Sequence, residues 1–231
     1  MRRHLPNALT CCNLLSGCVA ACSAFIGYFD LAFLFIIIGA VFDFLDGLTA
    51  RLLGVSSPIG KELDSLADII TFGFAPATML YFELCCIDYP AAMEPARDWL
   101  PFVAYLMTAF SALRLAKFNL DARQQTSFIG LPTPANALFW GSLLIGGYEV
   151  IYSSSCMVVL LLVLMLAACW LMVSGIPMFA LKFKHFGWKG NELRYVFIII
   201  CIPLIIVFRL LAPALIVIVY ILISAVAARR R

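Results

Sequence analysis

Charged residues are scarce in this chain, and histidine occurs only twice. Asp, Glu, Lys and Arg make up 13% of the 231 residues, while 64% of the residues are hydrophobic and the mean hydropathy is +1.03. An ordinary soluble domain carries about 25% charged residues. The composition therefore excludes the common water-soluble classes and indicates that the lipid bilayer is the solvent of this protein.

Cysteine pairs with metal-site spacing are also lacking. The nine cysteines show no CxxC motif, and most of them fall in apolar stretches. We expect them to be small buried hydrophobic residues. The first apolar stretch follows Arg2 and Arg3 but has no convincing small-residue cleavage site. We therefore expect that stretch to remain in the protein as its first helix.

Apolar stretches close to the length of about 20 residues that crosses a bilayer recur along the chain. We expect about eight transmembrane helices, at approximately 9–28, 31–53, 62–86, 99–120, 133–152, 156–181, 194–210 and 212–228. These spans use almost all of the sequence. The predicted architecture is therefore an all-α polytopic transmembrane helical bundle, with residues 1–231 forming a single catalytic domain.

Lysine and arginine are unevenly distributed among the loops. If the N-terminus is inside, all of the basic residues except Arg97 and Arg209 fall on the cytoplasmic side. We therefore expect an integral protein of the cell membrane with both termini and the active site on the cytoplasmic side. Such a basic rim attracts anionic lipid headgroups and phosphorylated substrates. The placement of charge gives no support for a nucleic-acid partner.

Two neighbouring predicted spans carry four aspartates. Asp43 and Asp46 are three residues apart, and Asp64 and Asp68 are four apart, so each pair shares one face of its helix. Between the pairs, residues 54–60 read GVSSPIG, which predicts a tight reversal. The reversal would bring the four carboxylates together at the membrane surface.

Ionisable groups at membrane depth are costly unless they find a partner, and they are therefore functional candidates. Four clustered carboxylates would repel one another without cations, and hard oxygen ligands suit Mg²⁺ or Mn²⁺. A pair of such ions can clamp the attacking and leaving oxygens of a phosphoryl displacement. Gly47 would let a phosphate approach the helix closely, and Arg51 offers a planar cation. The pattern predicts metal-dependent phosphoryl transfer.

From Asp43 to Asp68 the chain carries the pattern D-x2-D-G-x2-A-R-x8-G-x3-D-x3-D, which resembles the signature of the CDP-alcohol phosphatidyltransferase family. The resemblance implies two metal ions held by the four aspartates, and a homodimer. It also implies that Asp68 is a general base for the incoming hydroxyl and that CMP leaves. Gly47, Arg51 and Ser57 are implied to contact the CDP moiety.

Two further segments resemble the membrane-embedded phosphatidylserine synthases of that family. Residues 5–17 contain a PN-x2-T-x2-N-x3-G opening, in which Asn7 either contacts the nucleotide or belongs to a chain-entry turn. Residues 114–134 contain RLAKFN and FxGLPxP, with Lys117 where the pattern usually has arginine. The resemblance implies CDP-diacylglycerol and L-serine as substrates, within a membrane whose lipids surround the enzyme.

A zwitterionic acceptor needs a cation for its carboxylate and a hydrogen-bond acceptor for its ammonium group. The end of the fourth predicted span offers Arg114, Lys117 and Asn119. Arg114 and Lys117 are three residues apart and are expected to share a helix face, with one contacting the acceptor and the other a lipid phosphate. Their individual roles stay open.

Three alternatives remain. A sister phosphatidyltransferase would use glycerol 3-phosphate or inositol phosphate, which would demand a denser basic pocket. A membrane ion transporter would carry acids on several helices through the depth of the bilayer. A noncatalytic membrane scaffold would explain the hydrophobicity but not the complete signature.

Overall fold

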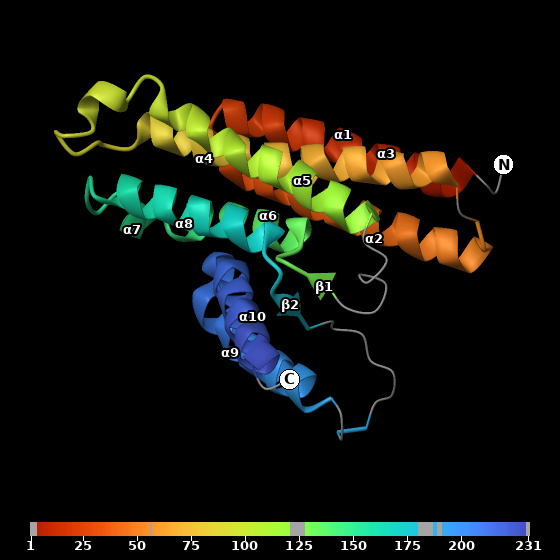
Figure 1. Ribbon diagram of the computed structural model, residues 1–231. Helices are drawn as coiled ribbons and strands as arrows, with labels where there is room; N and C mark the ends of the chain where they lie inside the picture. The colour runs from red at the N-terminus through yellow and green to blue at the C-terminus, as the bar shows by residue number, and fades with distance from the viewer. Residues whose placement is uncertain (1–3, 56, 121–127, 180–186, 189–190, 230–231) are drawn as a thin grey trace.

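The computed structural model describes residues 4–55, 57–120, 128–179, 187–188 and 191–229. Helices dominate these residues (Figure 1). The elements in chain order are α1 (Leu5–Phe25), α2 (Phe29–Leu53), α3 (Pro58–Asp68), η2 (Ile69–Phe74), α4 (Ala75–Cys86), η3 (Glu94–Ala96), η4 (Leu100–Tyr105), α5 (Leu106–Leu120), β1 (Phe128–Ile129), α6 (Thr133–Gly146), α7 (Tyr148–Ile151), α8 (Met157–Val173), β2 (Pro177–Met178), α9 (Glu192–Phe208), η6 (Arg209–Leu211) and α10 (Ala212–Arg229).

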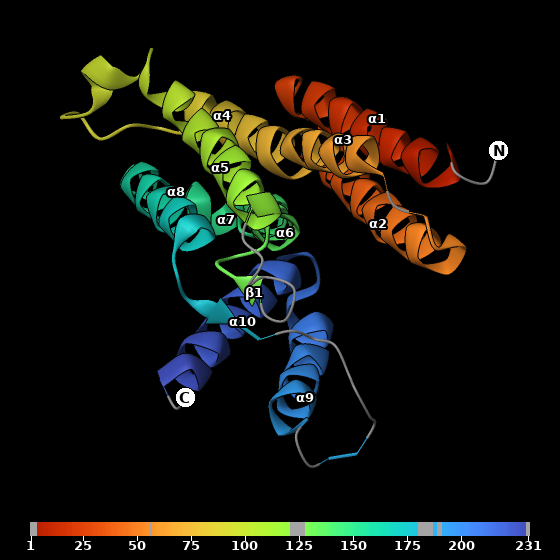
Figure 2. The same ribbon diagram turned by 45° about the vertical axis from the view of Figure 1, so that its right-hand side comes forward.

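The helices confirm the predicted helical membrane protein. In the part of the chain that the structure describes, four helical stretches are long and apolar enough to cross a bilayer: Leu5–Phe25, Phe29–Leu53, Pro58–Cys86 and Glu192–Ala228. The last of these stretches contains α9, η6 and α10, and the backbone turns at Arg209, where φ is 45°. Helices α9 and α10 then pack against each other (Figure 2), as expected for the two spans at 194–210 and 212–228. Each predicted span overlaps helix in the described residues, but the span expected at 156–181 is helical only over Met157–Val173, and β2 (Pro177–Met178) lies in its last part. The number of crossings stays a prediction.

The helices from α1 to α8 lie alongside one another, and α9 and α10 meet them at an angle (Figures 1 and 2). The start of α1, the end of α2 and the start of α3 share one end of this bundle, at the right of Figure 1. The connection between α4 and α5 lies at the opposite end. The turn between the two acid-bearing helices therefore sits beside the N-terminal turn of α1.

Small residues bring α1 close to α2 and η2. Ala20, Ala24 and Ala32 are fully buried in this contact region, as is usual where membrane helices approach closely. A Cβ atom on Gly17 would lie 2.8 Å from the Cα atom of Thr71 in η2. The absence of a side chain at Gly17 thus sets the distance between α1 and the helix that carries Asp64 and Asp68.

A π-helical segment, η2, begins at the residue after Asp68 and ends just before α4. Pro76 lies in the first turn of α4 and has no N–H to donate to the preceding turn. Such interruptions are often found at functional sites, because they change which side chains share a face. Here the π-helical segment lies between α3, which carries Asp64 and Asp68, and the mostly buried helix α4.

A short antiparallel ladder pairs β1 with β2, with Ile129 opposite Pro177. The Gly130 amide extends it by donating to the Ile176 carbonyl at 2.9 Å, and the Leu131 amide donates to the Leu171 carbonyl at 3.0 Å. The ladder was not predicted, because two-residue strands leave no hydrophobic alternation to recognise. It fixes the entry of α6 against the end of α8.

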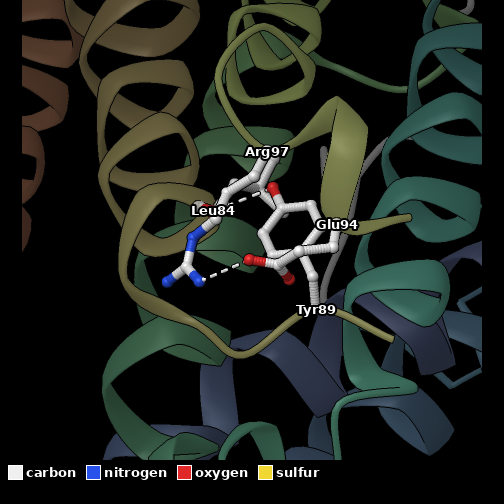
Figure 3. A network of polar contacts seen from close by, with 4 residues as sticks. All are labelled: Leu84, Tyr89, Glu94 and Arg97. Atoms are coloured by element: carbon white, nitrogen blue, oxygen red, sulfur yellow. Dashed lines mark hydrogen bonds and ion pairs between the residues drawn. The ribbon is translucent and has the colours of Figure 1, made fainter. Parts of the chain in front are cut away.

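A polar network closes the connection between α4 and α5 (Figure 3). The buried Tyr89 hydroxyl donates to the Leu84 carbonyl at 2.9 Å, which pairs an acceptor in the last turn of α4. Burial raises the pKa of the Tyr89 phenol, so this donor stays protonated. Arg97 stacks over the Tyr89 ring at 5.7 Å and forms an exposed ion pair with Glu94 at 3.1 Å.

The prediction that the cysteines are buried is wrong for most of them. Cys169 is buried, but six others are exposed on the outside of the helices: Cys11, Cys18, Cys22, Cys85, Cys86 and Cys156. A membrane protein can leave small apolar side chains on its surface, because lipid solvates them as well as the protein interior does. Apolar context therefore predicted the right helices but not the buried face.

We expect Gly17→Ala to destabilise the protein by about 1–3 kcal/mol, because the added methyl group must displace the backbone of Thr71. Gly175→Ala is the matched control, since a Cβ atom there meets nothing within 4 Å. Thermal unfolding of both purified variants in detergent measures the difference. Equal unfolding temperatures would show that the α1 contact has room to relax.

Candidate functional site

Three of the predicted metal-ligating aspartates form one cluster. Asp43 in α2 and Asp64 and Asp68 in α3 each offer a carboxylate oxygen, and these oxygens all lie within 4.8 Å of one another. Asp68 is buried, while Asp43 and Asp64 are partly exposed. Two helices that are adjacent in sequence thus present their acids to the same point.

The turn between these helices is well defined at both ends. Gly54 closes α2 in a left-handed conformation, with φ of 61°. Ser57 begins α3 as its N-cap, and its hydroxyl accepts a hydrogen bond from the Gly60 amide at 3.0 Å. The reversal predicted from residues 54–60 is confirmed, and its short length fixes the two helices side by side.

Asp46, the fourth predicted ligand, lies beside the cluster rather than within it. It is buried one helical turn after Asp43, and its Oδ2 atom accepts a hydrogen bond of 2.6 Å from the Thr10 hydroxyl of α1. Sequence spacing placed Asp46 on the right helix face. It could not show that a side chain from α1 reaches this carboxylate.

Asp68, the predicted base, also receives a hydrogen bond from α1. The Nδ2 atom of Asn13 donates to Asp68 Oδ1 at 3.1 Å, and Asn13 is fully buried. Thr10 and Asn13 belong to the PN-x2-T-x2-N pattern near the N-terminus, but the sequence assigned neither of them a role in the site. Their spacing of three residues on one helix was the signal available.

A cavity of about 540 Å³ opens next to the carboxylates. Its walls come from the first turns of α1, the last turns of α2, the reversal and the start of α3. The lining residues are Pro6, Asn7, Thr10, Asp46, Gly47, Ala50, Gly54, Val55, Ser57, Gly60, Lys61 and Asp64. A cavity of this volume suits a small-molecule ligand or the headgroup of a larger one.

The predicted nucleotide contacts divide into two groups. Asn7, Gly47 and Ser57 line the cavity. Arg51 is exposed outside the lining, and its Nε atom donates to the Gly47 carbonyl at 2.9 Å. Arg51 lies one turn beyond Gly47 on the same helix.

The acceptor-side residues of α5 occupy different environments. Arg114 is buried, lies over the Phe118 ring at 5.3 Å and is close enough to Asp68 for electrostatic attraction. Lys117 is exposed. The spacing suggested a shared face, but one helical turn carries the chain from the packed interior to the surface. Residues 121–127 of this segment lie outside the described residues.

Asn119 connects α5 to α3 instead of facing the cluster. Its Nδ2 atom donates to the Ser65 hydroxyl at 2.8 Å, and its backbone carbonyl accepts from Lys61 Nζ at 3.0 Å. Lys61 also lines the cavity. The sequence analysis gave Lys61 no role of its own, although it follows a signature glycine.

The donor set fits a divalent metal. Carboxylate oxygens are the ligands that Mg²⁺ and Mn²⁺ prefer. Asp64 Oδ1 is buried without a hydrogen-bond partner. A buried acceptor without a donor is costly, and a bound cation would satisfy it. Asp43 and Asp68 complete the three-residue group around the same point.

Comparison with known proteins agrees with the signature. The sequence model of CDP-alcohol phosphatidyltransferases matches residues 3–181. CDP-diacylglycerol–serine O-phosphatidyltransferase of Bacillus subtilis (strain 168) is 35% identical over 193 residues, which are 82% of this chain and 94% of the relative.

Two other relatives are matched over shorter stretches. The protein of the same name from Helicobacter pylori (strain ATCC 700392 / 26695) is 35% identical over 135 residues, and the chain spans about half of that relative's length, 54%. Archaetidylserine synthase of Methanothermobacter thermautotrophicus is 30% identical over 166 residues, covering 71% of this chain and 67% of the relative. The family model and the Bacillus relative each match more than two thirds of this chain. The chain therefore belongs to the CDP-alcohol phosphatidyltransferase family.

Proposed function

We propose that this protein transfers the phosphatidyl group of CDP-diacylglycerol to L-serine, releasing phosphatidylserine and CMP. The observation that carries the proposal is the carboxylate cluster of Asp43, Asp64 and Asp68. Asp64 lines a headgroup-sized cavity, and the buried cation of Arg114 is close enough to Asp68 for electrostatic attraction. The names of the relatives favour the same reaction, since two of them are serine phosphatidyltransferases and one is an archaetidylserine synthase.

The cavity is assigned to the CDP headgroup. Gly47 leaves room for a phosphate against the α2 backbone, because nothing lies within 4 Å of the position where its Cβ atom would be. Asn7 and Ser57 offer hydrogen-bonding groups beside Gly60, since a Cβ atom there would lie 3.1 Å from Asn7 Oδ1 and 3.0 Å from Ser57 Oγ. Arg51 at the rim supplies a cation for a phosphate oxygen. The acyl chains extend into the surrounding lipid.

Asp43, Asp46, Asp64 and Asp68 would hold Mg²⁺ or Mn²⁺, most simply as two ions. When bound, the metal neutralises charge on the transferred phosphoryl group and on the departing CMP. Asp46 lies at the boundary between the cluster and the cavity, since it also lines the cavity wall. It is therefore placed between the headgroup and the other acids.

Asp68 acts as the general base. It accepts the proton of the serine hydroxyl while the serine oxygen forms a bond to the phosphatidyl phosphorus. The bond from that phosphorus to the CMP oxygen breaks, and CMP leaves with the electron pair. Asn13 keeps Asp68 Oδ1 engaged, so the second oxygen of this carboxylate is available to the substrate.

Arg114 binds the carboxylate of serine. A buried guanidinium forms a strong paired contact with a carboxylate. Arg114 is the one buried basic side chain among the residues that the structure describes. A single buried cation suits a carboxylate with one negative charge better than the dianionic phosphate of glycerol 3-phosphate or inositol phosphate. Serine is therefore favoured over the sister acceptors.

Topology and assembly follow the same proposal. The cavity, Lys61, Arg51 and the end of α5 lie toward the end of the bundle where α1 begins (Figure 1). Basic residues favour the cytoplasmic side, so this end is assigned to the cytoplasm. We further propose that the chain crosses the cell membrane eight times, that both termini lie on the cytoplasmic side, and that the protein forms a homodimer.

The reaction is tested by CMP release from CDP-diacylglycerol with purified protein and Mg²⁺ or Mn²⁺. Serine, glycerol 3-phosphate, inositol and inositol phosphate are added one at a time. We expect release with serine alone, loss of release with EDTA and recovery with excess Mn²⁺. CMP release with another acceptor would overturn the assignment of serine as the substrate but would agree with the reaction of the family. CMP release after EDTA treatment without added metal would overturn the metal site.

Asp68→Asn should lower kcat by about a hundredfold or more, because it removes the proton acceptor while keeping the shape of the side chain. Folding should be retained, as judged by gel filtration and thermal unfolding. An Asp68→Asn protein that turns over at the wild-type rate would remove Asp68 from the role of base.

Arg114→Ala should raise KM for serine by about tenfold, which corresponds to ~1.4 kcal/mol of lost binding. Lys117→Ala is the matched control on the same helix, and its exposed position predicts an unchanged KM for serine. Arg114→Lys keeps the charge but loses the bidentate geometry, so its KM for serine should lie between those of Arg114→Ala and Lys117→Ala. Equal serine KM values in all three variants would exclude Arg114 from the acceptor site.

Gly47→Ala separates binding from folding. A methyl group at this helical position meets no neighbour and should increase the stability of α2 by about 0.5–1 kcal/mol. The same methyl group enters the cavity and should raise KM for CDP-diacylglycerol without changing KM for serine. A variant with an unchanged KM for the lipid would show that the headgroup does not lie against Gly47.

A further inference from the structure

The acid-bearing helices are not held by their own turn alone, because α1 contacts one carboxylate of each. Thr10 and Asn13 lie three residues apart on the same face of α1. Thr10 donates to Asp46 of α2 at 2.6 Å, and Asn13 donates to Asp68 of α3 at 3.1 Å. One helix face thus bridges the two acid pairs.

The Thr10 hydroxyl lies within hydrogen-bond distance of two acceptors. The hydroxyl oxygen lies 2.6 Å from Asp46 Oδ2 and 3.1 Å from the Pro6 carbonyl oxygen. A hydroxyl has one hydrogen to donate. The shorter contact falls in the range of about 2.5–2.7 Å for a hydroxyl bound to a carboxylate, whereas the longer one is ordinary. The hydrogen therefore points to Asp46.

Asn13 forms one hydrogen bond through its side chain and one through its backbone. It is fully buried, and its backbone carbonyl accepts a hydrogen bond from the Thr71 hydroxyl at 3.0 Å. Thr71 lies one turn after Asp68 on the same continuous helix. An amide oxygen facing Asp68 would repel the carboxylate, so the nitrogen must face it, as the structure has it.

A plain packing role is the alternative, and α1 provides a comparison. Ser16 is also buried on this helix, but its hydroxyl donates to the Cys12 carbonyl of its own helix at 2.8 Å. Ser23 does the same with the Val19 carbonyl. Such contacts are typical of hydroxyl groups in membrane helices. Thr10 and Asn13 differ because each donates a hydrogen bond to a carboxylate of another helix.

We propose that Thr10 and Asn13 are positioning residues that hold Asp46 and Asp68 in the arrangement that binds the divalent cation. This inference rests on the metal site of the proposed function. Each donor engages one oxygen of its carboxylate and restricts rotation of the acid side chain before the metal arrives. Donors that orient metal ligands typically contribute about 10–100-fold to metal affinity.

The test is Mn²⁺ binding to the full-length purified protein without any substrate, measured by the loss of the electron paramagnetic resonance signal of free Mn²⁺. Thr10→Val and Asn13→Leu keep the size of the side chains and remove the donors. We expect each to weaken Mn²⁺ binding by about 10–100-fold. Thr10→Ser keeps a hydroxyl and should restore the wild-type affinity, and Ser16→Ala should have no effect.

Thermal unfolding without metal distinguishes positioning from packing. We expect Thr10→Val and Asn13→Leu to unfold within a few degrees of the wild type without Mn²⁺, and to gain less stability than the wild type when Mn²⁺ is added. Unchanged Mn²⁺ affinity would overturn the proposal. A large loss of metal-free stability in Thr10→Val or Asn13→Leu, with the same gain in stability on adding Mn²⁺ as in the wild type, would assign packing and overturn it as well.

Failure of this inference is distinguishable from failure of the proposed reaction. Mn²⁺ binding needs neither CDP-diacylglycerol nor serine. If the wild-type protein binds Mn²⁺ but does not use serine, the assignment of serine as acceptor is wrong and the positioning role is unaffected. A wild type that turns over serine, with variants that bind Mn²⁺ normally, would remove the positioning role and leave the reaction.

Discussion

Repulsion among carboxylates in a membrane protein is the constraint on which the rest of this structure depends. Asp43, Asp64 and Asp68 lie within 4.8 Å of one another, at the junction of two helices. Such a group is stable only if neighbouring donors and cations offset the repulsion and the loss of hydration. The surrounding elements can be understood from that requirement. The capped turn fixes the helices, α1 supplies two donors, and Arg114 supplies a buried positive charge.

The same arrangement connects the two halves of the proposed reaction. Asp64 lines the cavity that we assign to the headgroup, and Asp68 is close enough to Arg114 for electrostatic attraction. Lys61 lines the cavity and also bonds the end of α5 through the Asn119 carbonyl. Helix α5, which carries Arg114, is therefore attached to a wall of the cavity.

Much of this could be predicted from the sequence. Helix positions followed from apolar length, and the acid faces followed from spacings of three and four residues, because both depend on local geometry. The reversal at residues 54–60 followed from its glycine and proline content. Contacts between distant segments did not follow. Thr10 and Asn13 could equally have bonded their own helix, as Ser16 does, and only the packing of α1 across the acids decides between these uses.

The side on which a residue faces was also decided by packing. Arg114 and Lys117 share a helix and a charge, yet one is buried beside Asp68 and the other is exposed. Asn119, which the motif grouped with them, bonds Ser65 and so joins two helices. Asp46 lies outside the tight group of acids, accepts a hydrogen bond from Thr10 and lines the cavity. A motif gives residue types and spacing, whereas the neighbours of each side chain come from helices far away in the sequence.

The central claim is that the aspartate cluster binds the divalent metal at which the CDP headgroup reacts. Anomalous diffraction from crystals grown with Mn²⁺ and CDP-diacylglycerol tests it most directly. The account predicts Mn²⁺ density among the carboxylates of Asp43, Asp64 and Asp68, next to a headgroup in the cavity that Gly47 lines. Mn²⁺ density elsewhere, or a headgroup bound away from an ion-free cluster, would contradict it.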